Sequence, residues 1–386
     1  MTPPNPNIPQ APRPHTRVIV DRAAFQHNIT GIKQGCQPGT RLMAVIKADA
    51  YGHGAAAMAQ TAVESGADFL GVARINEAHA LRQDGIKAPI LLFGPFFPDQ
   101  APWAAAHGIR LSVSSLETAQ ALSQAAKDLE TPVKIHIKTD TGMGRMGLST
   151  ANLEETVKEI LAMAQLPGLE VEGLYTHFAN ADEPDKTHTL GQFQTFMDLK
   201  QALSDQGLAP AICHCANSAA TLELPQTHLD MVRPGISLYG LSHSPGQAPE
   251  DDNLKRVMSI ESRIIHLKSV PKGFTVSYGS TWTAPRDTMI ATVPIGYGDG
   301  YRRFNSNKGA MLVGGQRAPV VGRVCMDLTM LDVGHIPGLA VGDPVVIMGR
   351  QGEETLWAEE LAALSHTVNY EVVASLTRRM PIHYTP

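Results

Sequence analysis

The sequence has few cysteines, few aromatic residues and no excess of basic charge. Aromatic residues make up 5% of the 386 residues, and the formal net charge at pH 7 is −5. That charge leaves no basic face for nucleic acid, so no nucleic-acid partner is expected. The four cysteines, Cys36, Cys213, Cys215 and Cys325, lack the spacing of a disulfide framework and indicate a reducing compartment.

Long apolar runs are missing as well. No run approaches the ~18 apolar residues that a membrane span requires. Residues 1–16 hold six prolines and no apolar segment typical of a signal peptide. We therefore expect a cytoplasmic protein without a membrane partner, and a proline-rich tail that is extended or disordered.

Apolar runs of strand length alternate with helical segments along most of the chain. Parallel strands need long crossovers, and eight such strands close a (β/α)8, or TIM, barrel. An open doubly wound sheet is the alternative, but no Gly-x-Gly-x-x-Gly follows the first run. The predicted strands are 42–47, 68–73, 89–93, 109–113, 132–138, 169–177, 211–215 and 231–236. The predicted helices are 22–34, 55–65, 75–84, 99–106, 115–128, 153–164, 189–206 and a short one from Ser218.

A polar segment rich in proline and glycine, 242–253, indicates a linker. Because the chain exceeds the size of one core, we expect two domains after the 1–16 tail. These are the barrel, 17–248, and a mainly β domain, 249–386, with which residues 17–20 can pair. The β segments expected there are 259–270, 288–295, 310–313, 318–324, 328–333 and 344–348, with a helix at 357–365 and a closing strand at 369–377.

Charged side chains stand at the carboxyl ends of several predicted barrel strands, where barrel active sites are built. Lys47 ends the first strand, and desolvation there would lower its pKa and suit it to bind a carbonyl group covalently. A strand-end lysine that extends to solvent is the alternative. Lys138, His177 and Arg233 stand at three further strand ends, which a purely structural barrel would not need.

An anion site is expected beside the last two barrel strands. Asn217 and Ser218 open a short helix whose free N–H groups attract an anion, and Gly235 lets the backbone N–H of Ile236 approach it. An Asn217 that only caps the helix is the alternative. No metal is expected at 213–215, because alternate residues of a strand face opposite sides.

Residues 44–54 resemble the cofactor-lysine segment of the alanine racemases, a family that binds pyridoxal 5'-phosphate (PLP). Further segments that resemble the family are 140–147, 232–236, 276–280, 295–303 and 322–327, and the likeness as a whole runs from Arg17 to Tyr370. It implies a PLP-dependent isomerase that interconverts L-alanine and D-alanine by two-base proton transfer, supplying D-alanine for peptidoglycan.

The resemblance also implies roles for single residues. Catalytic roles fall to Lys47, Tyr278, His177 and Arg233. Cofactor contacts fall to Lys47, Tyr51, Asn217, Ser218, Arg233, Gly235, Ile236 and Tyr370. Substrate contacts fall to Arg145, Met326, Tyr297 and Arg303, and Lys138 matches a lysine that is often carbamylated. The family further implies a homodimer with shared active sites, in which Tyr278 of one subunit faces Lys47 of the other.

Three alternatives share parts of this pattern. A broad-specificity racemase would have the same fold. A decarboxylase is disfavoured by Arg233, because that chemistry benefits from an acidic partner on the pyridine nitrogen. A non-catalytic PLP-binding barrel is disfavoured because such proteins lack the β domain that carries Tyr278.

Overall fold

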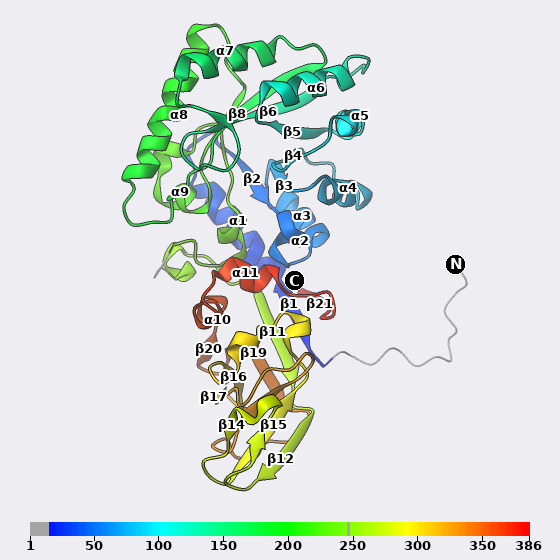
Figure 1. Cartoon of the computed structure of the whole chain (residues 1–386), viewed down its shortest axis with the longest axis vertical. Helices are drawn as coiled ribbons and strands as arrows, with labels where there is room; N and C mark the ends of the chain where they lie inside the picture. Colours follow the sequence, from blue (N-terminus) through cyan, green and yellow to red (C-terminus); the bar gives the residue numbers. More distant parts are fainter. Residues whose placement is uncertain (1–14, 245–247) are drawn as a thin grey trace, which may run out of the picture. The chain divides into compact units, whose positions relative to one another are not determined.

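The computed structural model describes residues 15–244 and 248–386. The chain divides into two compact units (Figure 1). The barrel unit is Asp21–Val257, and the β unit combines the first strand of the chain with Met258–Thr385. The predicted proline-rich tail lies almost entirely outside the described residues.

Eight parallel strands form the sheet of the barrel unit, in the order β10-β2-β3-β4-β5-β6-β8-β9. The two ends of this order meet, because the backbone N–H of Asp230 donates to Cys213 O at 3.1 Å and that of Arg233 to Ala216 O at 3.0 Å. The predicted (β/α)8 barrel is therefore confirmed. Its strands are β2 (Arg41–Val45), β3 (Phe69–Val72), β4 (Ile90–Leu92), β5 (Ile109–Val113), β6 (Val133–Asp140), β8 (Leu169–Tyr175), β9 (Ile212–His214) and β10 (Met231–Val232), and the short β7 (Leu148–Ser149) pairs with β6.

The helices of the barrel unit alternate with these strands, and neighbours along the chain pack on one another, as α6 does on α7 and α7 on α8. Asp21 caps the first helix, because its Oδ1 accepts the Ala24 N–H at 2.8 Å. The helices are α1 (Arg22–Gly35), α2 (Lys47–Tyr51), α3 (Ala55–Glu64), α4 (Ile75–Gln83), α5 (Ala101–Ala106), α6 (Leu116–Ala126), α7 (Leu153–Ala164), α8 (Thr187–Asp205) and α9 (Ser218–Glu223). Among the described residues, no helix combines the length and apolar character needed to cross a membrane.

The β unit is built on a sheet of order β17-β16-β19-β11-β1-β21, to which β20 adds through β19. The N-terminal strand belongs to this sheet, since β1 pairs antiparallel with β11. A second sheet has the order β12-β15-β18, and β13 pairs with β14. The strands are β1 (Arg17–Asp21), β11 (Met258–Arg263), β12 (His266–Val270), β13 (Thr275–Val276), β14 (Trp282–Thr283), β15 (Thr288–Val293), β16 (Ala310–Val313), β17 (Gln316–Pro319), β18 (Thr329–Asp332), β19 (Pro344–Gln351), β20 (Glu354–Leu356) and β21 (Ile382–Thr385).

The closing strand predicted at 369–377 is wrong. Asn369–Ala374 forms helix α11, which packs on α10 (Ala358–Leu364), and the strand that ends the chain is β21. Val372 and Val373 are buried in this helix, so tertiary packing overrides the β propensity of the pair. The strand predicted at 231–236 is also shorter, because Pro234 has no N–H to extend a ladder.

Candidate active site

Lys47 lies at the carboxyl end of β2, at the start of a turn with an unusual backbone. The four residues that follow it, Ala48 to Tyr51, all have φ near +53° and left-handed helical geometry. For L-residues this conformation costs roughly 1–2 kcal/mol each. The turn must therefore be held by its surroundings.

Two carboxylates hold the left-handed turn. Glu77 Oε1 accepts the Ala48 N–H at 2.6 Å, while its Oε2 accepts the N–H groups of Ala73 and Arg74 at 2.8 and 2.9 Å. Asp49 Oδ1 accepts the Ala55 N–H at 2.8 Å. Sequence reasoning missed Glu77, and no local signal could have found it, because it comes from α4 behind the next strand.

The environment of Lys47 favours its neutral amine. Burial and the positive charge of Arg145 lower the pKa of Lys47, and the Glu77 carboxylate only partly opposes this. A neutral amine is the form that attacks a carbonyl or accepts a proton.

Arg145 is exposed on the loop that follows β6. Asp140 shapes this loop, because its Oδ1 accepts the N–H groups of Gly142, Met143 and Gly144 at 3.0, 2.8 and 3.0 Å. Lys138, at the end of the same strand, is buried. Burial and the charges of Arg145 and Arg233 lower the pKa of Lys138 to about 8.

Arg233 is buried and is held from several sides. Its guanidinium donates to the carbonyls of Thr176 and Cys215 at 2.9 and 3.1 Å. It also lies 3.1 Å from Nδ1 of His177 and 3.0 Å from Nδ1 of His214. Burial and the Arg233 charge hold the pKa of His177 well below its ordinary value, so this imidazole is neutral and can accept from Arg233.

Ser218, Gly235 and Tyr51 come together beside the end of β2. The Ser218 hydroxyl oxygen accepts the N–H groups of Gly235 and Ser237 at 2.9 and 3.4 Å, which leaves its hydrogen free to donate. A Cβ atom on Gly235 would lie 2.7 Å from the Tyr51 hydroxyl, so a larger residue would have to displace that hydroxyl. The buried Ile236 follows directly. Asn217 caps α9, with Oδ1 accepting the Ala220 N–H at 3.0 Å.

The five remaining predicted site residues belong to the β unit. Tyr278 is 71% exposed and Met326 is 53% exposed. Tyr297 and Met326 lie on two loops that contact each other, since the N–H of Gly298 donates to Met326 O at 2.9 Å. The exposed Arg303 begins the short helix Arg303–Asn305, and Tyr370 lies in α11.

Comparison with known proteins gives one consistent family. Models of the alanine racemase N-terminal and C-terminal domains match residues 20–243 and 257–384. The alanine racemase of Desulfosudis oleivorans is 48% identical over 371 residues, 95% of each chain, and that of Desulforamulus reducens 47% over 365 residues, 95% of this chain and 97% of the relative. A solved alanine racemase from a D-cycloserine-producing Streptomyces lavendulae superposes with a TM-score of 0.92 at 35% identity, covering 97% of this chain and 98% of that one. The alanine racemase from Bacillus anthracis with bound L-Ala-P superposes with a TM-score of 0.90 at 37% identity, covering 97% of this chain and 96% of that one.

Proposed function

The chain belongs to the alanine racemase family and is an enzyme that racemises alanine, and from this premise we propose that it works with PLP attached to Lys47. The observation that carries the proposal is the environment of Lys47, an amine with a lowered pKa that a strained turn fixes at the barrel mouth. The cofactor, the roles of single residues and the dimer belong to the proposal.

The residues at the barrel mouth fit PLP. The Ser218 hydroxyl, the Ile236 N–H and the Tyr51 hydroxyl offer donors to a phosphate beside Gly235, where a Cβ atom would displace the Tyr51 hydroxyl. For the aldehyde carbon, Lys47 offers an amine whose pKa is lowered by burial and by the charge of Arg145. The buried Arg233 offers N–H donors to the pyridine nitrogen, and a guanidinium cannot accept a proton from it.

When bound, PLP supplies the electron sink for the carbanion that forms as alanine loses its Cα proton. Arg233 keeps the pyridine nitrogen neutral, which limits delocalisation into the ring and favours return of the proton to Cα. Lys47 Nζ removes or returns the proton on one face. Arg145, on the loop shaped by Asp140, binds the substrate carboxylate.

The second base is the Tyr278 hydroxyl, which acts on the opposite face of Cα. We propose that it comes from the partner subunit of a homodimer, with Tyr297 and Arg303 at the substrate entrance and the Met326 N–H on the substrate carboxylate. High exposure of apolar and aromatic side chains in the β unit supports this assignment, since Tyr278 and Met326 are more than half exposed and such surface typically marks interaction sites.

The test of the activity and cofactor uses purified holoenzyme with both enantiomers of alanine and a panel of larger amino acids. Chiral analysis should show interconversion of alanine, and borohydride reduction followed by peptide mapping should place the pyridoxyl group on Lys47. A label on a different lysine would refute the cofactor assignment, whereas racemisation of the larger amino acids would favour the broad-specificity alternative.

Subunit mixing tests the shared site. Lys47→Ala and Tyr278→Phe homodimers should each be nearly inactive. Random exchange makes about half of the dimers mixed, and each mixed dimer holds one intact site, so about a quarter of wild-type activity should return. If both residues act within one chain, no activity returns after exchange has been verified.

A further inference from the structure

A chain of buried polar side chains starts at Arg233 and continues inside the barrel. Nη1 of Arg233 lies 3.0 Å from Nδ1 of His214, and Nε2 of His214 lies 2.8 Å from Nδ1 of His136. Both imidazoles are fully buried, and Arg233 is 4% exposed. None of the residue roles assigned above uses either histidine.

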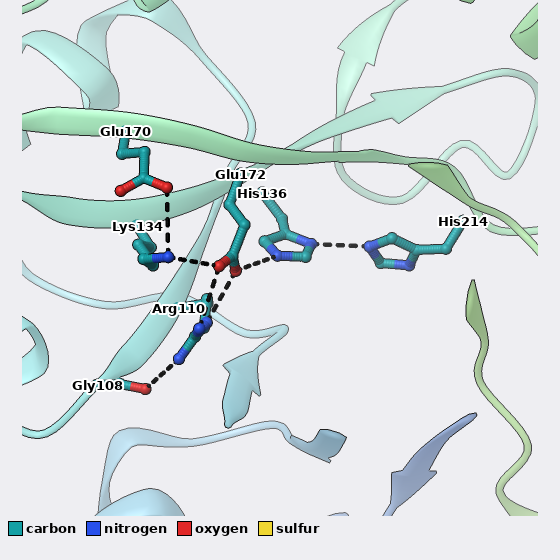
Figure 2. Close-up of polar contacts among 7 residues, drawn as sticks. All are labelled: Gly108, Arg110, Lys134, His136, Glu170, Glu172 and His214. Atoms are coloured by element: carbon teal, nitrogen blue, oxygen red, sulfur yellow. Dashed lines mark hydrogen bonds and ion pairs between the residues drawn. The ribbon is translucent and has the colours of Figure 1, made fainter. Parts of the chain in front are cut away.

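The chain ends at the buried carboxylate of Glu172 (Figure 2). Glu172 Oε2 lies 3.1 Å from Nε2 of His136 and accepts Arg110 Nε at 2.8 Å. Its Oε1 accepts Arg110 Nη2 at 3.1 Å and Lys134 Nζ at 2.9 Å. In Figure 2, Glu172 stands between these two cations and His136, with His214 beyond.

The chemistry of the two ends fixes the direction of every hydrogen bond between them. A guanidinium only donates, so Nδ1 of His214 must accept and its proton resides on Nε2. That Nε2–H donates to Nδ1 of His136, whose proton therefore resides on Nε2 and is donated to Glu172. Burial lowers the pKa of both imidazoles, and in His214 the Arg233 charge adds to this effect, which agrees with two neutral rings.

The backbone makes room for this arrangement. A Cβ atom on Gly173, which pairs with His136 across β6 and β8, would lie 2.4 Å from Nδ1 of that ring. The imidazole thus occupies space that only glycine leaves, next to the carboxylate it binds. Buried polar groups weaken a core unless all are satisfied, and apolar side chains would fill the barrel at lower cost.

We propose that Glu172, His136 and His214 are positioning residues that hold Arg233 in one orientation toward the pyridine nitrogen. The inference rests on the proposed function, because it takes the Arg233 partner to be PLP. Glu172 acts by fixing one tautomer of each imidazole, so that Arg233 always meets an acceptor at His214 Nδ1.

We call the hydrogen-bonded chain Glu172–His136–His214–Arg233 the relay. Glu172→Gln should reverse the hydrogen-bond directions within it. We expect the amide oxygen at the Oε1 position, because two cationic donors, Lys134 Nζ and Arg110 Nη2, meet it there, whereas only Arg110 Nε donates at the Oε2 position and that bond is lost. The amide N–H then points at His136 Nε2, which becomes an acceptor. Its proton moves to Nδ1, and His214 in turn presents an N–H from Nδ1 against the guanidinium of Arg233. A lost hydrogen bond to a charged group predicts a fall in kcat of about tenfold to a hundredfold, with KM nearly unchanged.

The experiment compares wild-type holoenzyme with Glu172→Gln and with Glu170→Gln as matched control. Glu170 lies on the same strand and forms an ion pair with Lys134 at 3.3 Å, so the control removes an equal charge without altering the bond to His136. Nitrogen NMR of histidine-labelled enzyme reports the tautomer of His214. We expect the proton on Nε2 in wild type and control and on Nδ1 in Glu172→Gln, together with the fall in kcat.

Two results would overturn the inference: an unchanged His214 tautomer in Glu172→Gln, or a changed tautomer with unchanged kcat. Neither touches the proposed function, which is tested on the wild-type enzyme by alanine racemisation and by the pyridoxyl label on Lys47. Should Glu172→Gln not fold, His136→Gln and His136→Leu replace it. The amide of His136→Gln can accept from His214, so it should retain more activity than the leucine variant, and equal losses would refute the relay.

Discussion

Replacing Ala48 with glycine should stabilise the protein, although the same change in an ordinary helix destabilises it. Ala48 has φ +53° and an exposed side chain, so glycine relieves backbone strain without loss of packing. Its backbone bonds to Glu77 and Gly52 remain available.

The magnitude follows from two opposing contributions. Left-handed geometry costs an alanine roughly 1–2 kcal/mol, and the greater freedom of an unfolded glycine takes back about 0.5–1 kcal/mol. Ala48→Gly should therefore raise the free energy of unfolding by about 0.5–1 kcal/mol. In a domain of this size that corresponds to a rise in Tm of about 1–4 °C.

Ala121→Gly is the matched control, because Ala121 is exposed in the right-handed helix α6. It should lower the free energy of unfolding by about 1 kcal/mol. Calorimetric unfolding of both variants in the presence of saturating PLP shows whether each substitution raises or lowers Tm. A decrease in Tm for Ala48→Gly similar to that of the control would refute the claim that the turn after Lys47 is strained.

Three further predictions concern the same end of the barrel. A lysine whose pKa is lower in the folded state than in the unfolded state destabilises the protein while it is protonated. The loss of stability is complete below the folded-state pKa and disappears above the unfolded-state pKa. Below pH 8 in CO2-free buffer, Lys138→Met should thus raise the free energy of unfolding by up to ~3 kcal/mol, measured as a higher Tm. The gain should vanish towards pH 10.5. Gly235→Ala should displace the Tyr51 hydroxyl and weaken PLP binding about tenfold or more in a fluorescence titration. Glu77→Gln removes the negative charge that accepts the Ala48 N–H and that raises the pKa of Lys47. The Lys47 amine of the cofactor-free enzyme should therefore titrate at lower pH in reactivity measurements.

Much of the fold follows from local sequence patterns. Strand-length apolar runs separated by helical segments indicate a parallel barrel, because this alternation is set by which residues can be buried over short distances. The predicted strand 109–113 and helix 153–164 coincide with β5 and α7. The pattern fails at 369–377, where β-branched residues form a helix because tertiary packing buries them on one face.

The sequence also pointed to single residues at strand ends, since the carboxyl ends of barrel strands meet at one rim. It could not indicate the left-handed turn after Lys47, because alanine, aspartate and tyrosine normally avoid that conformation. The carboxylate of Glu77, 29 residues away from Ala48, holds the turn.

The buried relay is the clearest product of tertiary structure. His136 and His214 are 78 residues apart, and His214 lay in a predicted strand, 211–215, where the only chemical role considered was a disfavoured metal site. Barrel closure brings their strands to one interior, and Gly173 leaves the space that one ring fills. The sequence determined which groups can donate or accept a proton. Only the folded barrel decided which of them meet, because hydrogen bonds act over about 3 Å while a chain pattern is local.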